Sequence, residues 1–227
     1  MSKNSIMPLN KNQIAWRAAQ DIKEGMYINL GIGLPVLMAD YIDKEVIYHS
    51  ENGILGMGPK AKKGEEDPDL IDAAKNSVTI VKGGCYFDSA MSFAMIRGGH
   101  LDAVFLGAFE VAENGDIANW STGDSSVIPS VGGAMDLVSG VEDVRVLMSF
   151  FDKRGKSKLV KSLTYPITGK NCVKRIYTDL AVIDVINNRF VVKEIIDNSL
   201  IETLQKATTA DLILAENLEI LKVPESI

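Results

Sequence analysis

The sequence has few of the residues on which metal and disulfide chemistry depends. Its 227 residues include only two cysteines, Cys85 and Cys172, and two histidines, His49 and His100. The cysteines form no CxxC motif and no framework of the secreted kind, which favours two reduced, buried thiols in a cytosolic protein. The histidines are too few for a persuasive metal centre or catalytic triad, so no bound metal is expected.

The sequence also lacks an excess of positive charge and any long hydrophobic run. The net charge is -6 and the pI about 5.0, which argues against binding to nucleic acid. No apolar run approaches the ~18 residues of a membrane span. The first ten residues, MSKNSIMPLN, lack the apolar segment of a signal peptide. These features predict a soluble, cytoplasmic protein.

Apolar segments alternate between strand-like and helix-like patterns along the chain. Hydrophobic residues make up 46% of the sequence and charged residues 24%, values that suit a globular fold. The pattern predicts an α/β protein with an open, mostly parallel sheet flanked by helices and with antiparallel strands near the C-terminus. We expect a single domain over residues 1–227, because no linker or internal repeat is visible.

Individual elements follow from periodicity and turn signals. Helices are expected at 11–24, from about Pro35, and at 89–97, 134–140 and 199–209. Strands are expected at 26–30, 45–50, 77–84, 101–111, 144–151, 177–186 and 189–196. The last two flank Asn187-Asn188, a hairpin signal. Residues 51–59 and 121–133 are expected to be loops, and 60–69 an exposed, mobile, charged segment.

Glu51 is the first candidate for chemistry. It lies between an apolar strand and the Asn52-Gly53 turn, at the carboxyl end of the strand, where ligands collect in open α/β sheets. The strand would fix its backbone, and the following glycines would let a bulky ligand approach. A surface glutamate in an ordinary turn is the alternative that spacing alone leaves open.

Two glycine turns are further candidates. Gly132-Gly133 precedes a predicted helix, so its N–H groups could hold a phosphate or an oxyanion, or the turn could serve packing alone. Gly31-Ile32-Gly33 follows a strand as in a dinucleotide-binding fingerprint. The third glycine is missing because position 36 is Val36, which argues against a nicotinamide site.

Six segments, taken together, resemble the beta subunits of family I CoA-transferases. The resemblance covers roughly residues 12–216, with the segments in the family's order. They are NLGIGLP (29–35), SENGILGMGP (50–59), GEEDPDLI (64–71), FAMIRGGHLD (93–102), NGDIANW (114–120) and GGAMDLVSG (132–140).

The resemblance implies a mechanism and a partner. Glu51 would be the nucleophile that forms a glutamyl-CoA thioester in a ping-pong reaction. Gly133 would supply oxyanion donors, and Gly31, Ile32, Gly33 and Gly132 would help to bind coenzyme A, which is a substrate and not a resident cofactor. The active site would form with a separate alpha subunit, commonly as an α2β2 heterotetramer.

The resemblance also suggests substrates. Segments 122–137 and 164–185 are more similar to the 3-oxoadipate branch than to the acetoacetate branch, with succinyl-CoA as the donor. One departure is the segment MSFFDKRG, in which Phe150 and Phe151 replace a histidine common in relatives. CoA phosphates could meet lysines and arginines of two clusters, namely Lys60, Lys62 and Lys63, or Lys153, Arg154 and Lys156.

Three other functions remain as alternatives. An acyl-CoA hydrolase would use the same glutamate with water as the acceptor. A non-catalytic CoA-binding subunit would need no nucleophile. A dinucleotide-binding oxidoreductase would require NADH binding despite the incomplete fingerprint.

Overall fold

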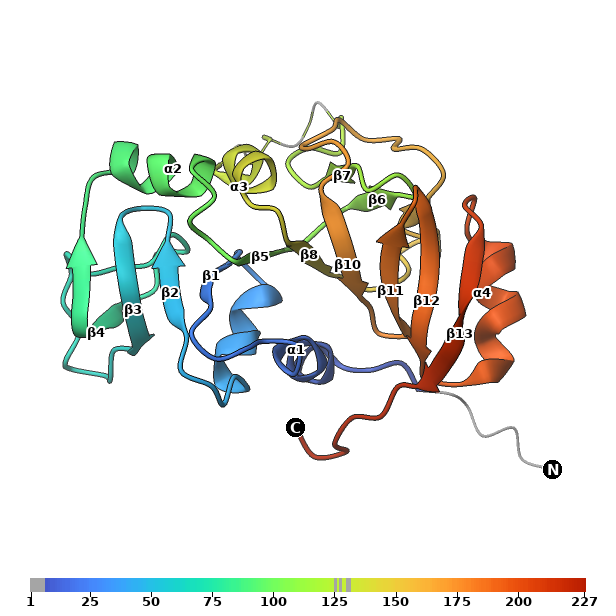
Figure 1. Cartoon of the computed structure of the whole chain (residues 1–227), viewed down its shortest axis with the longest axis horizontal. Helices are drawn as coiled ribbons and strands as arrows, with labels where there is room; N and C mark the ends of the chain where they lie inside the picture. The colour runs from blue at the N-terminus through green and yellow to red at the C-terminus, as the bar shows by residue number, and fades with distance from the viewer. Residues whose placement is uncertain (1–6, 125, 127, 130–131) are drawn as a thin grey trace.

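A ten-stranded sheet runs through the computed structural model, which describes residues 7–124, 126, 128–129 and 132–227 (Figure 1). Its strand order is β13-β12-β11-β10-β8-β5-β1-β2-β3-β4. The strands are β1 (Tyr27–Leu30), β2 (Ile47–Ser50), β3 (Ile54–Lys60), β4 (Val78–Tyr86), β5 (Ala103–Leu106), β8 (Val144–Leu147), β10 (Val173–Tyr177), β11 (Ala181–Ile186), β12 (Arg189–Ile195) and β13 (Leu212–Ile220). A small second sheet contains β6 (Glu110–Ala112), β7 (Ile117–Ala118) and β9 (Leu159–Val160).

The centre of the large sheet is parallel and its flanks are mixed. Strands β10, β8, β5, β1 and β2 pair in parallel. The pairs β10–β11 and β11–β12 are antiparallel, which confirms the predicted fold class. The sequence did not predict the second antiparallel addition, β2–β3–β4, at the opposite flank.

Helices cover both faces of the sheet (Figure 1). On one face α1 (Lys11–Ala19) and the 3₁₀ helix η1 (Pro35–Asp40) pack on a core that includes Ile28 and Phe105. On the other, α2 (Ser89–Arg97), α3 (Ala134–Gly140) and α4 (Ile201–Ala207, after the 3₁₀ turn η2, Asn198–Leu200) pack on a second core. No helix among the described residues is both long enough and apolar enough to cross a membrane.

Local sequence signals account for several boundaries. Asn10 caps α1 through a reciprocal capping box with Gln13. Asn187 and Asn188 both have positive φ, 51° and 59°, as the tight turn between β11 and β12 requires. The predicted helix at 89–97 and the predicted helix at 134–140 are confirmed.

The prediction of a glycine-rich loop at 51–59 was wrong beyond the turn itself, because residues 54–60 form β3. A Cβ on Gly56 would lie 2.9 Å from Cα of Gly84 in β4. The glycines therefore let two strands approach closely instead of breaking the structure. The predicted charged segment 60–69 is largely exposed.

Other expected elements proved too long. The expected strand 101–111 divides at Gly107, so that β5 and β6 belong to different sheets. The helix expected at 11–24 ends at Ala19, and the strand expected at 144–151 ends at Leu147. Cys85, expected to be buried, is exposed because β4 is the outermost strand on its side; Cys172 is buried as expected.

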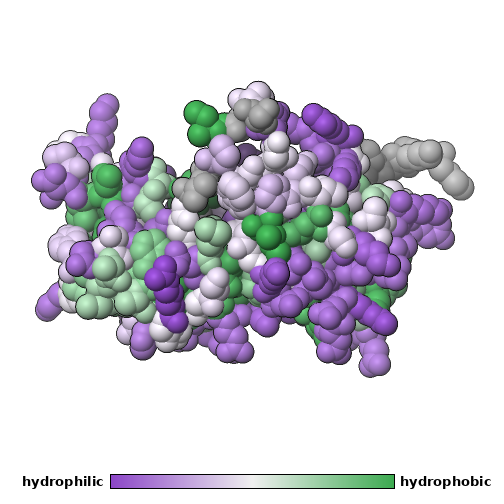
Figure 2. Space-filling model, turned by 90° about the horizontal axis from the view of Figure 1, so that it is seen from above, coloured by the Kyte–Doolittle hydropathy of each residue, from purple (hydrophilic) through white to green (hydrophobic). Residues whose placement is uncertain are grey.

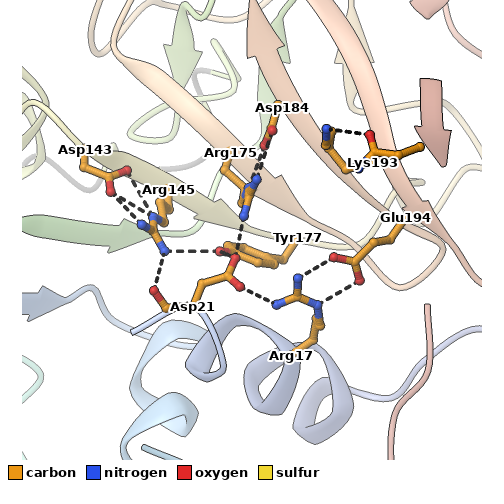
Figure 3. A network of polar contacts seen from close by, with 10 residues as sticks. Arg17, Asp21, Asp143, Arg145, Arg175, Tyr177, Asp184, Lys193 and Glu194 are labelled. Atoms are coloured by element: carbon orange, nitrogen blue, oxygen red, sulfur yellow. Dashed lines mark hydrogen bonds and ion pairs between the residues drawn. The ribbon is translucent and has the colours of Figure 1, made fainter. Parts of the chain in front are cut away.

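A network of ion pairs fastens α1 to the sheet (Figure 3). Asp21, just after α1, accepts hydrogen bonds from Arg17, Arg175 and Tyr177 at 2.8, 2.6 and 2.6 Å. Arg17 also pairs with Glu194 of β12, and Arg175 pairs with Asp184 of β11 at 2.6 Å. Burial would raise the pKa of Asp21, but the hydrogen bonds from Tyr177 and the two arginines outweigh burial and hold it below its ordinary value.

Candidate active site

Glu51 directly follows β2, in a turn whose shape several contacts fix. The N–H of Gly53 donates to the carbonyl of Ser50 at 3.0 Å. Gly53 has φ of 119°, and a Cβ there would overlap the carbonyl oxygen of Phe87. The Asn52 side chain donates to Ile71 O at 2.7 Å and accepts from the Ser50 hydroxyl at 2.6 Å. The sequence Ser-Glu-Asn-Gly therefore holds the backbone of Glu51 rigidly.

The Glu51 side chain reaches Gly133, at the N-terminus of α3. The carboxylate lies against the backbone of Gly133, close enough for the Gly133 N–H to act on the pKa of Glu51. A Cβ on Gly133 would lie 2.8 Å from the carboxylate carbon of Glu51, so any side chain there would displace that carboxylate. The structure thus brings together the two residues that the sequence analysis selected as catalytic. Val131, in the same turn, lies outside the described residues.

The environment of Glu51 favours the protonated carboxyl more than water does. Burial raises its pKa, the Gly133 N–H acts in the opposite direction, and the charge of Asp136 in α3 raises it further. The net effect is a pKa above the ordinary glutamate value. A carboxylate with a raised pKa is a stronger base, and so a better nucleophile, in the fraction that is ionised.

A large cleft opens beside Glu51, with a volume of about 1460 Å³. Gly31, Ile32, Gly132 and Gly133 of the predicted CoA-binding turns line it, whereas Gly33 does not. The N–H of Gly31 donates to Phe105 O at 2.7 Å, and a Cβ on Gly31 would lie 2.8 Å from that oxygen. Gly31 is therefore required by the contact between β1 and β5, and it also keeps the cleft wall free of side chains.

His49 and its partners form a buried support under the site that sequence reasoning missed. Its Nδ1 accepts from the Asn29 side-chain amide at 3.1 Å, and its Nε2–H donates to the Ser92 hydroxyl at 3.0 Å. The same Asn29 amide donates to His49 O at 3.1 Å. Burial lowers the pKa of His49 to about 4, so the ring is neutral at pH 7. No spacing in the sequence links β1, β2 and α2, so no local signal predicts this contact.

Phe150, which departs from the expected pattern of relatives, does not line the cleft. Its side chain is fully buried in the core beside Phe151, with the ring centroids 4.9 Å apart. The cleft wall after β8 is formed by Met148, Ser149 and Lys158 instead. The aromatic replacement therefore changes the packing behind the wall and adds no aromatic ring to it.

The basic clusters proposed for CoA phosphates lie in different settings. Lys60, at the end of β3, lines the cleft and is exposed. Lys156 reaches the buried carboxylate of Glu110 at 3.3 Å and is engaged there. In the part of the chain that the structure describes, no group of three His, Cys, Asp or Glu side chains is placed to hold a metal.

The site thus combines a carboxylate at a strand end, a facing glycine backbone and a large cleft on an α/β scaffold. Comparison with known proteins identifies the family. A family model described as Coenzyme A transferase matches residues 11–207. This chain belongs to the coenzyme A transferase family.

Several curated relatives have similar sequences over nearly their whole length. The beta (B) subunit of 3-oxoadipate CoA-transferase from Acinetobacter baylyi is 55% identical over 207 residues, covering 90% of this chain and 95% of that protein. The corresponding subunit of a probable succinyl-CoA:3-ketoacid coenzyme A transferase from Bacillus subtilis is 46% identical over 209 residues, covering 91% and 96%.

Solved structures share the fold. Glutaconate coenzyme A-transferase from Acidaminococcus fermentans superposes with a TM-score of 0.66 at 18% identity, covering 96% of this chain and 90% of that one. The acyl-CoA transferase YdiF from Escherichia coli O157:H7 gives a TM-score of 0.71 at 20% identity. That superposition covers 96% of this chain but only 44% of the YdiF chain.

Proposed function

We propose that this chain is the glutamate-bearing subunit of a two-subunit CoA-transferase. It moves CoA from a donor acyl-CoA to a 3-oxo acid. The favoured donor is succinyl-CoA, and the favoured acceptor is 3-oxoadipate, followed by acetoacetate. The observation that carries the proposal is the Glu51 carboxylate facing the Gly133 amide in the cleft. The order of substrates rests on similarity to the beta subunits of 3-oxoadipate CoA-transferases.

The chemistry divides into four acyl transfers. The Glu51 carboxylate attacks the thioester carbonyl, the C–S bond breaks, and a mixed anhydride and the CoA thiolate form. The thiolate then attacks the glutamyl carbonyl and releases the first acid as a carboxylate, leaving a glutamyl-CoA thioester. The second acid repeats the two steps in reverse order. Both acids are ionised at pH 7, so no general base is needed.

The first step is the difficult one, because a carboxylate displaces a more basic thiolate. The ordinary pKa values of a glutamic acid and of a thiol differ by about 4 units, which corresponds to about 5 kcal/mol in the free energy of protonation. The raised pKa of Glu51 narrows this gap. The N–H of Gly133 is placed to stabilise the oxyanion of each tetrahedral intermediate, and binding energy from the distant parts of CoA offsets the remainder.

Hydrophobic side chains around the cleft suit a partner subunit. Figure 2, seen from the side of α2 and α3, shows hydrophobic patches between hydrophilic regions on that face. Ile32 on the cleft wall, Met91 of α2 and Met135 of α3 are 67%, 51% and 50% exposed. An alpha subunit seated there would bury these side chains and close the cleft over the reacting groups.

Co-expression with an alpha subunit, taken from the neighbouring reading frame, tests this function. The complex should transfer CoA from succinyl-CoA to 3-oxoadipate, and the Glu51→Ala complex should assemble but not transfer. CoA release that needs no acceptor acid would instead identify a hydrolase. Unchanged turnover in the Glu51→Ala complex would remove Glu51 from the mechanism, and a fully active lone chain would contradict the two-subunit proposal.

A further inference from the structure

Lys158 occupies the same cleft as Glu51, on the wall formed after β8. Its backbone N–H donates to Phe150 O at 2.9 Å, which fixes it beside the end of that strand, and Met148 and Ser149 line the cleft next to it. In the strand order, β8 is separated from β2 by β5 and β1. Three spacings of ~4.8 Å place the two strand ends roughly 14 Å apart.

Within the described part of the chain, no carboxylate forms an ion pair with Lys158. Of the cleft lysines, Lys60 and Lys82 are exposed to solvent, and Lys44 pairs with Asp43 at 2.5 Å. Lys158 is half-buried, and burial lowers its pKa to about 8 although Asp179 and Asp152 act in the opposite direction.

The two carboxylates whose charges act on Lys158, those of Asp179 and Asp152, accept hydrogen bonds from backbone N–H groups. Asp179 accepts from the N–H of Phe150 at 2.7 Å. Asp152 accepts from the N–H groups of Arg154 and Lys156, both at 2.8 Å. A half-buried ammonium that lines a cleft and has no ion-pair partner among the described residues is suited to an anionic ligand.

We propose that Lys158 binds the distal carboxylate of a dicarboxylic acid whose other carboxyl group reacts at Glu51. The inference rests on the proposed function and names the feature by which the site selects its acids. Counting ~1.2 Å per extended bond and ~2.8 Å for the carboxylate–ammonium contact, the glutamate stem, a four- to six-carbon diacid and the lysine stem reach at most roughly 20–22 Å. This reach exceeds the separation of the strand ends, so one ligand can contact both residues.

A CoA phosphate is the other anion that this ammonium could meet. The two cases differ in which substrates are affected, because every reaction of the enzyme uses CoA but only diacids carry a distal carboxylate. A loss confined to diacids indicates carboxylate binding, whereas a loss with every acid indicates CoA binding.

The test compares acceptor acids in the complex with its alpha subunit. Acetyl-CoA serves as a common donor without a distal carboxylate, and 3-oxoadipate and succinate are compared with acetoacetate and butyrate. The variants are Lys158→Met, which keeps the stem and removes the charge, Lys158→Arg, which keeps the charge, and Lys161→Met, an exposed lysine outside the cleft.

Lys158→Met should lower kcat/KM for the diacids by about 10- to 100-fold, as expected for loss of one charged hydrogen bond. It should change the value for the monoacids less than about threefold, and Lys158→Arg should recover part of the loss. Equal losses with both classes, or no loss with the diacids, would overturn the assignment. If wild type transfers CoA to none of these acids, the proposed function itself fails, which is a different result.

Discussion

The backbone amide of Gly133 faces the carboxylate of Glu51 across the cleft, although the two residues come from turns far apart in the sequence. A Cβ at position 133 would displace the Glu51 carboxylate from its present position. The contact therefore combines a steric reason for glycine with an electrostatic role, since the same N–H can stabilise negative charge that develops near Glu51.

Gly133→Val tests that contact. Its side chain would displace the Glu51 carboxylate and obstruct the approach of the thioester, so we expect kcat to fall by ~10²–10³ while the complex still folds. Gly132→Val is a comparison variant, because Gly132 also lines the cleft but a Cβ there meets no atom within 4 Å, so we expect a smaller loss of kcat. Steady-state kinetics with thermal unfolding of both complexes check the prediction; an unaltered kcat for Gly133→Val would assign the turn to packing alone.

The raised pKa of Glu51 predicts a pH effect with a definite sign. Only the ionised carboxylate attacks the thioester, so kcat/KM for the donor should fall on the acid side at a pH above the ordinary glutamate pKa. Asp136→Asn removes a charge that raises this pKa and should move the acid limb to lower pH. A pH–rate profile that is unmoved, or moves upward, would contradict this view of the site.

Much of the scaffold could be predicted from the sequence, and the reason is local. The capping box at Asn10, the Asn187-Asn188 turn and the helix at 89–97 each depend on neighbouring residues. Glu51 was found because it joins a strand to an Asn-Gly turn, but spacing alone could not separate it from a surface glutamate. The six segments that resemble family I CoA-transferases identified Glu51 as the candidate nucleophile.

The remainder depends on contacts between distant segments. β3 was missed because Gly56 appears as a loop signal until Gly84 of β4 lies against it. The support of His49 by Asn29 and Ser92 joins three separate elements. Lys158 became a candidate because it lines the cleft and because Asp152 and Asp179 already accept hydrogen bonds from the backbone. None of these relationships leaves a pattern within a short window of sequence.

Lys158 should also affect stability in a pH-dependent way. Its folded-state pKa of about 8 lies below the unfolded value near 10.4, so the unfolded chain binds more protons between these limits. The penalty for holding the charge is fully present below pH 8 and is relieved as the pH rises toward 10. Lys158→Met should therefore raise Tm at pH 7, and its advantage over wild type should shrink by pH 9.5. A lower Tm at pH 7 would indicate that Lys158 stabilises the fold.

Asp21 should contribute stability with the opposite dependence on pH. Its folded-state pKa is depressed, so its contribution is present above the unfolded value of about 3.9 and is lost as the pH falls through the lower folded value. Asp21→Asn should lower the free energy of unfolding by roughly 2–3 kcal/mol at pH 7, somewhat below the range for fully buried pairs. The difference should persist at pH 5 and disappear in stronger acid.

Asp43→Asn provides the control for Asp21, since Asp43 pairs with Lys44 but has a side chain 77% exposed. Urea unfolding of the two variants at several pH values makes the comparison. An Asp21 variant as stable as the Asp43 variant would show that the network in Figure 3 contributes little to holding α1 on the sheet.

The central claim is that Glu51 carries CoA covalently between the two halves of the reaction. Incubating the active complex with donor acyl-CoA and no acceptor should leave a CoA-sized mass on the peptide that contains Ser50-Glu51-Asn52. The thioester should outlive the anhydride, because a carboxylate is the better leaving group. Borohydride should inactivate the enzyme only after acyl-CoA is added, and Glu51→Gln should show neither effect. An active wild-type complex that never carries the adduct on Glu51 would contradict the account.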